Sequence, residues 1–253
     1  MQPLSTPASD QYNRISQHDQ AISIHYPASF SLDERKLTFL WLTDVTNALL
    51  TVYGKLPMDY FNLSIKRSSS RSSPVPWGHV ERGNPSNILL VINPALGYDE
   101  LVNDWTAFHE LSHLLLPYRG YGDIWLSEGL ATYYQNIIQA RSGLLDEVRM
   151  WRKIAAGFER GVNNQQWRQL NLTEVSDNLA ETRQYMRVHW SGVLFWMSAD
   201  VALREQNGNS LDRLLKQLND CCGGKNMSAE AIVEKLDELA ESDLFVTSFR
   251  EFR

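Results

Sequence analysis

The chain has 253 residues, of which 43% are hydrophobic and 11% aromatic, so it is long enough to bury a large core. Its formal net charge of -6 lacks the basic excess of proteins that follow a phosphate backbone, and we expect no nucleic acid partner. The N-terminus lacks the basic start and apolar run of a secretory leader, and no apolar run approaches membrane-spanning length. We therefore expect no membrane partner and, as written, a cytoplasmic chain; a trimmed core of a longer protein could instead be secreted or periplasmic.

The first hundred residues predict a mixture of strands and one long helix. A capping serine, Ser31, or alternatively Asp33, precedes a helical pattern that ends at Gly54. The serine- and proline-rich run 68–76 is typical of a loop. Alternating or apolar runs that predict strands lie at 21–27, 60–67, 77–82 and 87–94.

Almost everything after Asp99 has helical spacing of its apolar residues. The predicted helices cover 99–116, 123–143, 144–161, 181–206, 210–218 and 228–240. The fold class is therefore α+β, with a small N-terminal α/β lobe over 1–97 and a mainly helical lobe over 98–253. The two cysteines, Cys221 and Cys222, are neighbours, and we expect both to be reduced thiols.

The sequence HELSH at 109–113 places two histidines and a glutamate within five residues. On a helix, His109 and His113 lie above one another and can bind one metal ion from the same face. Glu110 lies about 100° round the helix, beside the metal but not bound to it. There it can act as a general base that accepts a proton from the attacking water.

A catalytic zinc site needs a third protein ligand and one open coordination position. Glu128 follows His113 after fourteen intervening residues, and Gly120 and Gly122 among them favour a turn that brings a second helix back. We place the N-cap of that helix at Asp123. The pattern predicts Zn²⁺ as cofactor, held by His109, His113 and Glu128.

HELSH followed by WLSEGLATYYQ resembles the gluzincin, or thermolysin-like, zinc metallopeptidases. The pattern W-x-x-E-G-x-A-x-Y resembles the glycyl aminopeptidase family and related zinc aminopeptidases. The resemblance covers about 75–250 and is most specific over 105–135. It implies that both lobes form one thermolysin-like catalytic domain, and that the substrate is a peptide or a protein. It also implies hydrolysis by a zinc-activated water with Glu110 as the base.

Peptide hydrolysis also needs a hydrogen-bond donor for the oxyanion that forms at the carbonyl. The aminopeptidases that the chain resembles use a tyrosine three residues before a glycine. Here the residue three before Gly192 is His189. Histidine can donate such a bond, so His189 is the predicted donor, and Tyr185, one turn earlier, is the alternative.

The chain departs from those aminopeptidases in the binding of the substrate's free amine. The glycine-rich motif ending in Glu-Asn is absent from the sequence, and the nearest candidate carboxylate is Glu81. The strand over 87–93 is predicted to pair with an extended peptide as an added edge strand. Exopeptidase and endopeptidase activity both stay open. So do a zinc-binding module without catalysis and a zinc hydrolase of a non-peptide substrate.

Overall fold

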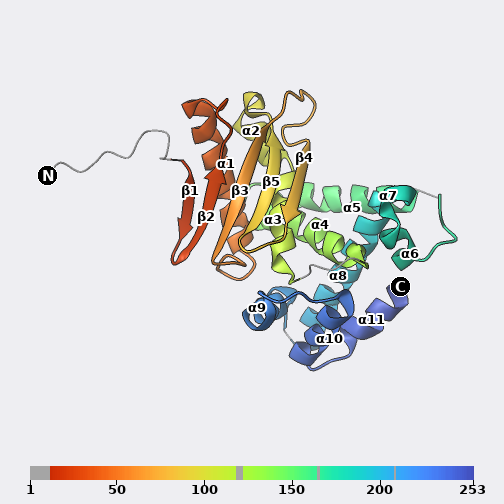
Figure 1. Cartoon of the computed structure of the whole chain (residues 1–253). Coiled ribbons are helices and arrows are strands. Elements are labelled where there is room, and N and C mark those ends of the chain that lie inside the picture. The colour runs from red at the N-terminus through yellow and green to blue at the C-terminus, as the bar shows by residue number, and fades with distance from the viewer. Residues whose placement is uncertain (1–11, 118–121, 164–165, 208) are drawn as a thin grey trace. The chain divides into compact units, whose positions relative to one another are not determined.

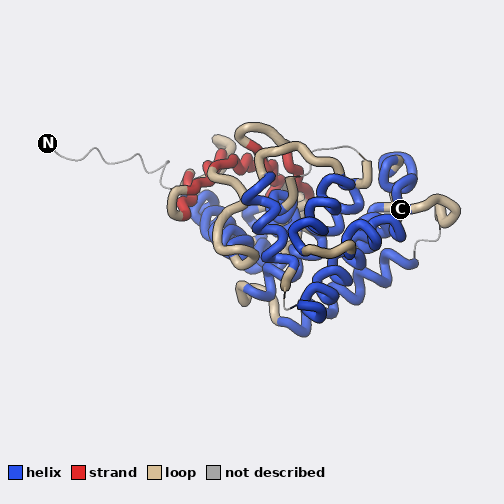
Figure 2. The backbone as a smooth tube through the Cα atoms, turned by 90° about the horizontal axis from the view of Figure 1, so that it is seen from below, coloured by secondary structure: helices blue, strands red, loops and turns tan. Residues whose placement is uncertain are grey.

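The computed structural model describes residues 12–117, 122–163, 166–207 and 209–253, and the α+β class is confirmed. The chain separates into two compact units, Met1–Leu111 and Ser112–Arg253. Figure 1 shows the strands in the first unit, and Figure 2 shows that helices make up almost all of the second. The lobe boundary at residue 97 and the joining of both lobes into one catalytic domain stay predictions.

The first unit contains a five-stranded sheet with the strand order β1-β2-β3-β5-β4. The strands are β1 Arg14–Gln17, β2 Gln20–His25, β3 Tyr60–Arg67, β4 Trp77–Glu81 and β5 Ser86–Ile92. The three inner strands are parallel, whereas β1 and β4 pair antiparallel at the two edges. The prediction that 87–93 offers an edge to a peptide is therefore wrong, because β5 is paired on both sides. The edge strand next to β5 is β4.

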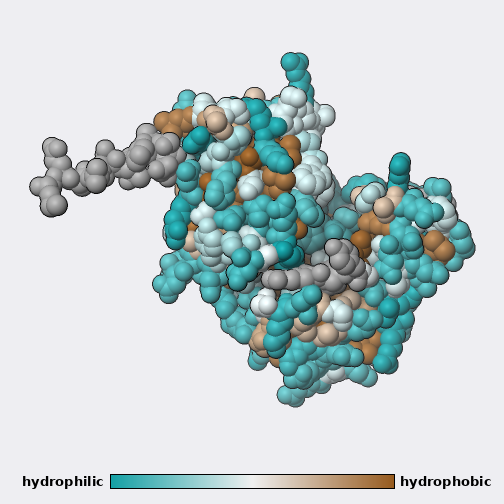
Figure 3. Space-filling view, viewed as in Figure 1, coloured by the Kyte–Doolittle hydropathy of each residue, from teal (hydrophilic) through white to brown (hydrophobic). Residues whose placement is uncertain are grey.

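One face of the sheet is buried and the other is partly open to solvent. Burial alternates along β3, where Phe61, Leu63 and Ile65 are buried and Tyr60 is exposed. This period of two is the pattern of a strand with one face in the core. Figure 3 shows a largely hydrophilic surface over the sheet, interrupted by hydrophobic patches.

Helix α1, Leu32–Leu50, lies behind the sheet in Figure 1 and buries Trp41, Leu42 and Val45. The prediction of Ser31 as its N-cap is confirmed, and Ser31 forms a capping box with Glu34. A second bond anchors this helix start, because Arg67 at the end of β3 binds the carboxylate of Glu34 at 2.7 Å. The hydrogen bond from Arg67 lowers the pKa of Glu34 to about 2.

The helix predicted over 99–116 is broken into two helices and a 3-10 turn. The pieces are α2 Tyr98–Asn103, α3 Thr106–Ser112 and η2 His113–Leu115, after the short 3-10 helix η1 Pro94–Leu96. The break occurs at Asp104, which is extended and whose Oδ1 accepts a bond from the Thr106 amide at 2.8 Å. An aspartate can compete with the helix for backbone amides in this way, so the apolar spacing alone did not reveal the break.

The second unit consists of helices. They are α4 Ile124–Arg141, α5 Glu147–Asn163, α6 Leu172–Asp177, α7 Leu179–Thr182, α8 Tyr185–Asn207, α9 Leu211–Cys222, α10 Ala229–Ala240 and α11 Leu244–Phe252. Helices α6 and α11 lie in stretches where no helix was predicted. The predicted helix over 181–206 was placed too early, because Arg183 is left-handed and separates α7 from α8.

Two smaller expectations also need correction. Asp123 does occupy the N-cap of α4, but its backbone is left-handed and its side chain makes no capping bond. Its Oδ1 instead accepts bonds from Trp125 Nε1 and Thr173 Oγ1. The cysteines are not free thiols in this structure, since Cys221 and Cys222 form a disulfide.

Helices α4 and α8 form the central pair of the second unit and approach closely through two glycines. A methyl group added at Gly129 would lie 2.3 Å from the Gly192 backbone, and one added at Gly192 would lie 2.2 Å from the Trp125 carbonyl oxygen. Trp196 Nε1 also donates to the Leu126 carbonyl at 2.7 Å. Neither helix could accommodate a larger residue at the crossing without moving. Within the described ranges, no helix is both long and apolar enough to span a membrane.

Candidate metal centre

The two histidines of the HELSH sequence lie on one helical run formed by α3 and η2. His109 is 3% exposed, and the Trp105 ring meets it edge-on with a centroid distance of 5.4 Å. His113 follows four residues later, in the first position of η2. A metal ligand needs a fixed ring, and burial together with aromatic packing restricts the rotation of His109.

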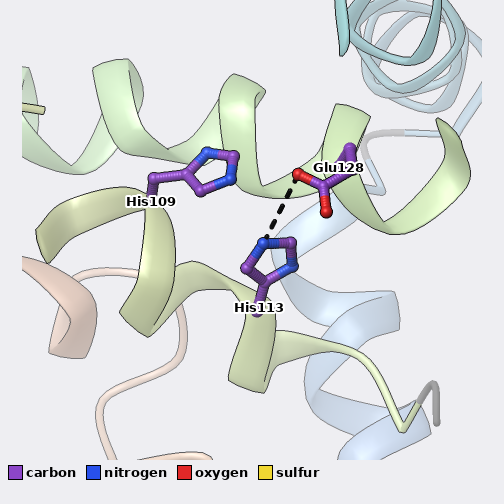
Figure 4. Close-up of side chains that lie close together, drawn as sticks. All are labelled: His109, His113 and Glu128. Carbon is purple, nitrogen blue, oxygen red and sulfur yellow. Dashed lines mark ion pairs between the residues drawn. The ribbon is translucent and has the colours of Figure 1, made fainter. Parts of the chain in front are cut away.

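Glu128, in the second turn of α4, faces the two imidazoles. Its Oε2 lies 3.6 Å from His113 Nε2. The dashed line in Figure 4 marks this ion pair. One ligand atom each from His109, His113 and Glu128 lie within 4.8 Å of one another. Two imidazole nitrogens and one carboxylate oxygen are the donor set of a catalytic zinc with an open position. The residues present therefore fit Zn²⁺.

The orientation of His113 is fixed by a serine that the sequence did not single out. Ser127 Oγ lies 3.1 Å from His113 Nδ1, and both groups are largely buried. Because this hydrogen bond occupies Nδ1, the other ring nitrogen, Nε2, is the one that faces Glu128. Partners of this kind set the tautomer and ring orientation of metal-binding histidines. The only available signal was the position of Ser127 directly before Glu128.

His189, on α8, lies near the same carboxylate oxygen of Glu128 as His113. Its Nε2 is 3.5 Å from Glu128 Oε2, and its Nδ1 is 3.1 Å from Thr132 Oγ1. The group of ligand atoms that lie within 4.8 Å includes Glu128 but not His189. His189 is thus a neighbour of the donor set. Tyr185 is 47% exposed at the start of α8, and none of the hydrogen bonds among the described residues involves its side chain.

Within the first unit, Glu110 lies against the edge strand β4. The carboxylate-bearing side chain is buried, and a methyl group added at Gly78 would lie 2.6 Å from Glu110 Cγ. Along β4 the exposed residues alternate with the half-buried ones, so Gly78 and Glu81 face opposite sides. Glu81 is exposed and accepts a bond from Asn87 Nδ2 at 2.9 Å. This geometry does not support Glu81 as the ligand of a substrate amine.

Two neighbouring tyrosines hold the remainder of α4 in place. Tyr133 donates to Asp200 at 3.1 Å, and Tyr134 donates to Asp212 at 2.6 Å. Burial raises the pKa of both phenols well above the usual value, and the two aspartates raise it further. Both hydroxyls therefore remain protonated donors, and they connect α4 to α8 and α9.

The turn between His113 and Glu128 is described only in part. Gly122 has a φ of 90°, a conformation that glycine adopts readily and that supports the predicted turn. Gly120 lies outside the described residues.

A family model described as M61 glycyl aminopeptidase matches residues 120–212. No curated protein gives a significant sequence match. The family match covers α4 and α8, the two helices that carry Glu128 and His189, and it confirms the resemblance that the WLSEGLATYYQ pattern indicated.

Solved structures similar to the chain include an aminopeptidase N family protein, a zinc metallopeptidase and a hydrolase. An aminopeptidase N family protein from Idiomarina loihiensis is 18% identical with a TM-score of 0.63, covering 87% of this chain and 43% of that one. A variant of the M1 zinc metallopeptidase from Deinococcus radiodurans, bound to the substrate Tyr-Ser-Ala, is 16% identical with a TM-score of 0.57. The match covers 95% of this chain and 50% of that one. Native yeast LTA4 hydrolase is 12% identical with a TM-score of 0.62, and the match covers 94% of this chain and 38% of that one. At these identities the likeness establishes the fold, and the chain spans about half the length of these proteins or less.

Proposed function

We propose that the chain is a zinc-dependent metallopeptidase with a thermolysin-like catalytic domain and an aminopeptidase-like activity. The observation that carries the proposal is the group formed by His109, His113 and Glu128, whose ligand atoms lie within 4.8 Å of one another. The family match over 120–212 and the zinc metallopeptidase fold support it. A peptide or protein is the proposed substrate.

In this proposal His109, His113 and Glu128 hold the zinc ion. When bound, zinc polarises the substrate carbonyl and lowers the pKa of a water molecule. Glu110 accepts the proton of the attacking water and passes it to the leaving amine, the two steps of a general base that becomes a general acid. His189 donates a hydrogen bond to the oxyanion.

The substrate backbone pairs with the edge strand β4, Trp77–Glu81. An edge strand offers unpaired amide and carbonyl groups to an extended peptide. Gly78 supports this role, because a side chain there would meet Glu110 and separate the strand from the base. The peptide backbone then lies beside the carboxylate of Glu110, which acts on it.

The variant Glu110→Gln tests the function most sharply, since it removes the base and keeps the shape of the side chain. We expect the variant to bind zinc as the wild type does and to lose turnover by at least about 10²-fold. The control is Glu251→Gln, which changes an exposed carboxylate of α11 and should leave turnover unchanged. Peptidase activity retained by Glu110→Gln would contradict the mechanism.

The substrates distinguish the alternatives. A set of peptides with free and with blocked N-termini separates exopeptidase from endopeptidase activity, and cleavage of only the free peptides supports the aminopeptidase assignment. Bound zinc without cleavage of any peptide would favour a non-catalytic module. Cleavage of aminoacyl or ester reporters alone would favour a zinc hydrolase of another substrate class.

A further inference from the structure

Helix α4 carries two hydroxyl groups that each contact the Nδ1 atom of an imidazole beside Glu128. Ser127 contacts His113, and Thr132 contacts His189 at 3.1 Å. Thr132 is 3% exposed and lies one helical turn after Glu128, so both side chains leave α4 on the same face. The contact with Thr132 matters because the proposed role of His189 depends on which of its two ring nitrogens carries the proton.

A neutral imidazole carries one N–H, and its position decides which nitrogen donates. His189 Nε2 lies 3.5 Å from Glu128 Oε2. An ionised carboxylate only accepts hydrogen bonds, so it favours the tautomer with the proton on Nε2. In that tautomer Nδ1 is an acceptor, and the hydroxyl of Thr132 is the donor that satisfies it.

We infer that Thr132 is a positioning residue that holds His189 as the Nε2–H tautomer, which keeps Nε2 as the nitrogen that can donate to the substrate oxyanion. The inference rests on the proposed function for its catalytic consequence. The tautomer itself is a property of the protein alone. The same bond fixes the rotation of the ring, because Nδ1 and Nε2 are both then in contact with α4.

The close crossing of α4 and α8 makes this contact possible. Gly129 and Gly192 meet at the crossing, where either added methyl group would lie closer than 2.4 Å to the backbone of the other helix. Thr132 is three residues after Gly129, and His189 is three residues before Gly192. A short threonine side chain can therefore reach the imidazole directly.

The test compares Thr132→Val, which removes the hydroxyl and keeps a β-branched side chain, with Thr132→Ser, which keeps the hydroxyl. We expect Thr132→Val to lower kcat about 10- to 100-fold with KM little changed, the size of effect found for partners that orient active-site histidines. Thr132→Ser should recover most of kcat. Thr46→Val is the matched control, because Thr46 is a buried threonine of α1 whose hydroxyl bonds the Leu42 carbonyl.

A second readout does not depend on activity. Nitrogen-15 NMR of the His189 ring, assigned with His189→Gln, should show a protonated Nε2 in the wild type and in Thr132→Ser, and a mixture of tautomers in Thr132→Val. An unchanged tautomer together with unchanged kcat in Thr132→Val would overturn the inference and leave the proposed function intact. If the wild type cleaves no peptide, the proposed function fails, and the NMR comparison still decides whether Thr132 sets the tautomer.

Discussion

Replacing Gly192 by alanine should disable the site by separating two helices. The added Cβ would lie 2.2 Å from the Trp125 carbonyl oxygen and 2.6 Å from Gly129 Cα, whereas ordinary contacts begin at 3.4 Å. The backbone atoms on both sides cannot rotate away as a flexible side chain could. Helices α4 and α8 must therefore move apart by about 1 Å, at an overpacking cost of about 1–3 kcal/mol.

The same displacement acts on the groups that flank the crossing. His189 Nε2 is 3.5 Å from Glu128 Oε2, and a further 1 Å would remove His189 from the position proposed for the oxyanion donor. A misplacement of about 1 Å at a catalytic group lowers the rate about 10²-fold. Alanine is the better helix former by about 0.5–1 kcal/mol, so the net loss of stability should stay below the overpacking cost.

The assay combines kcat on a cleaved peptide, the free energy of unfolding in urea and the zinc content. We expect kcat of Gly192→Ala to fall about 10²-fold and the protein to remain folded. Gly224→Ala is the matched control, because a methyl group added at Gly224 meets nothing within 4 Å. Wild-type kcat and stability in Gly192→Ala would refute the argument that the glycine contact sets the position of His189.

Three further predictions follow from single contacts. Ser127→Ala leaves the Nδ1 atom of His113 without its hydroxyl partner and should weaken zinc affinity about 10- to 100-fold in a competition titration with a chelator. Gly78→Ala should displace Glu110 and lower kcat about 10-fold or more without loss of zinc, because the added carbon would meet the base at 2.6 Å. Glu34→Gln should destabilise the fold at neutral pH, and the difference from wild type should vanish as the pH falls from about 4.5 to about 2, because the folded-state pKa of this carboxyl is lowered.

Each of these has an outcome that contradicts it. Equal zinc affinity in wild type and Ser127→Ala would show that the serine does not orient its histidine. Loss of zinc in Gly78→Ala would place Glu110 among the ligands. Because the folded-state pKa of Glu34 is lowered, the ionised carboxylate stabilises the fold at any pH above its unfolded-state pKa, and this stabilisation is lost on acidification. If the stability difference between wild type and Glu34→Gln instead grew as the pH fell, the Arg67 bond could not be its cause.

Much of the site could be predicted because it depends on short-range spacing. His113 lies four positions after His109, and a helix brings the two to one face whatever surrounds it. Strands β3, β4 and β5 and helix α4 also lie where their apolar patterns placed them. These elements have strong local signals in the spacing of their apolar residues.

Other features depend on contacts between distant residues and had no local signal. The order of strands in the sheet is set by pairing across β3, β5 and β4, so the sequence could not show that β4 is the edge. The break at Asp104 arises from one side-chain bond that competes with the helix. The bond from Thr132 to His189 joins residues 57 positions apart.

The glycines next to the site residues were the one available hint. Gly129 follows Glu128 directly, and Gly192 lies three residues after His189. A glycine inside a helix costs about 0.5–1 kcal/mol relative to alanine, and such a cost indicates a close approach of another backbone. Read in this way, the two glycines would have predicted that α4 and α8 cross at the site.

The central claim is that His109, His113 and Glu128 together hold one zinc ion, and metal analysis of purified protein tests it most directly. The wild type should contain one zinc per chain. His113→Ala and Glu128→Ala should lose it while keeping the far-ultraviolet circular dichroism of the wild type, and Glu110→Gln should retain it. A wild type that takes up no zinc, or variants of Glu128 that bind zinc as tightly as the wild type, would contradict the account.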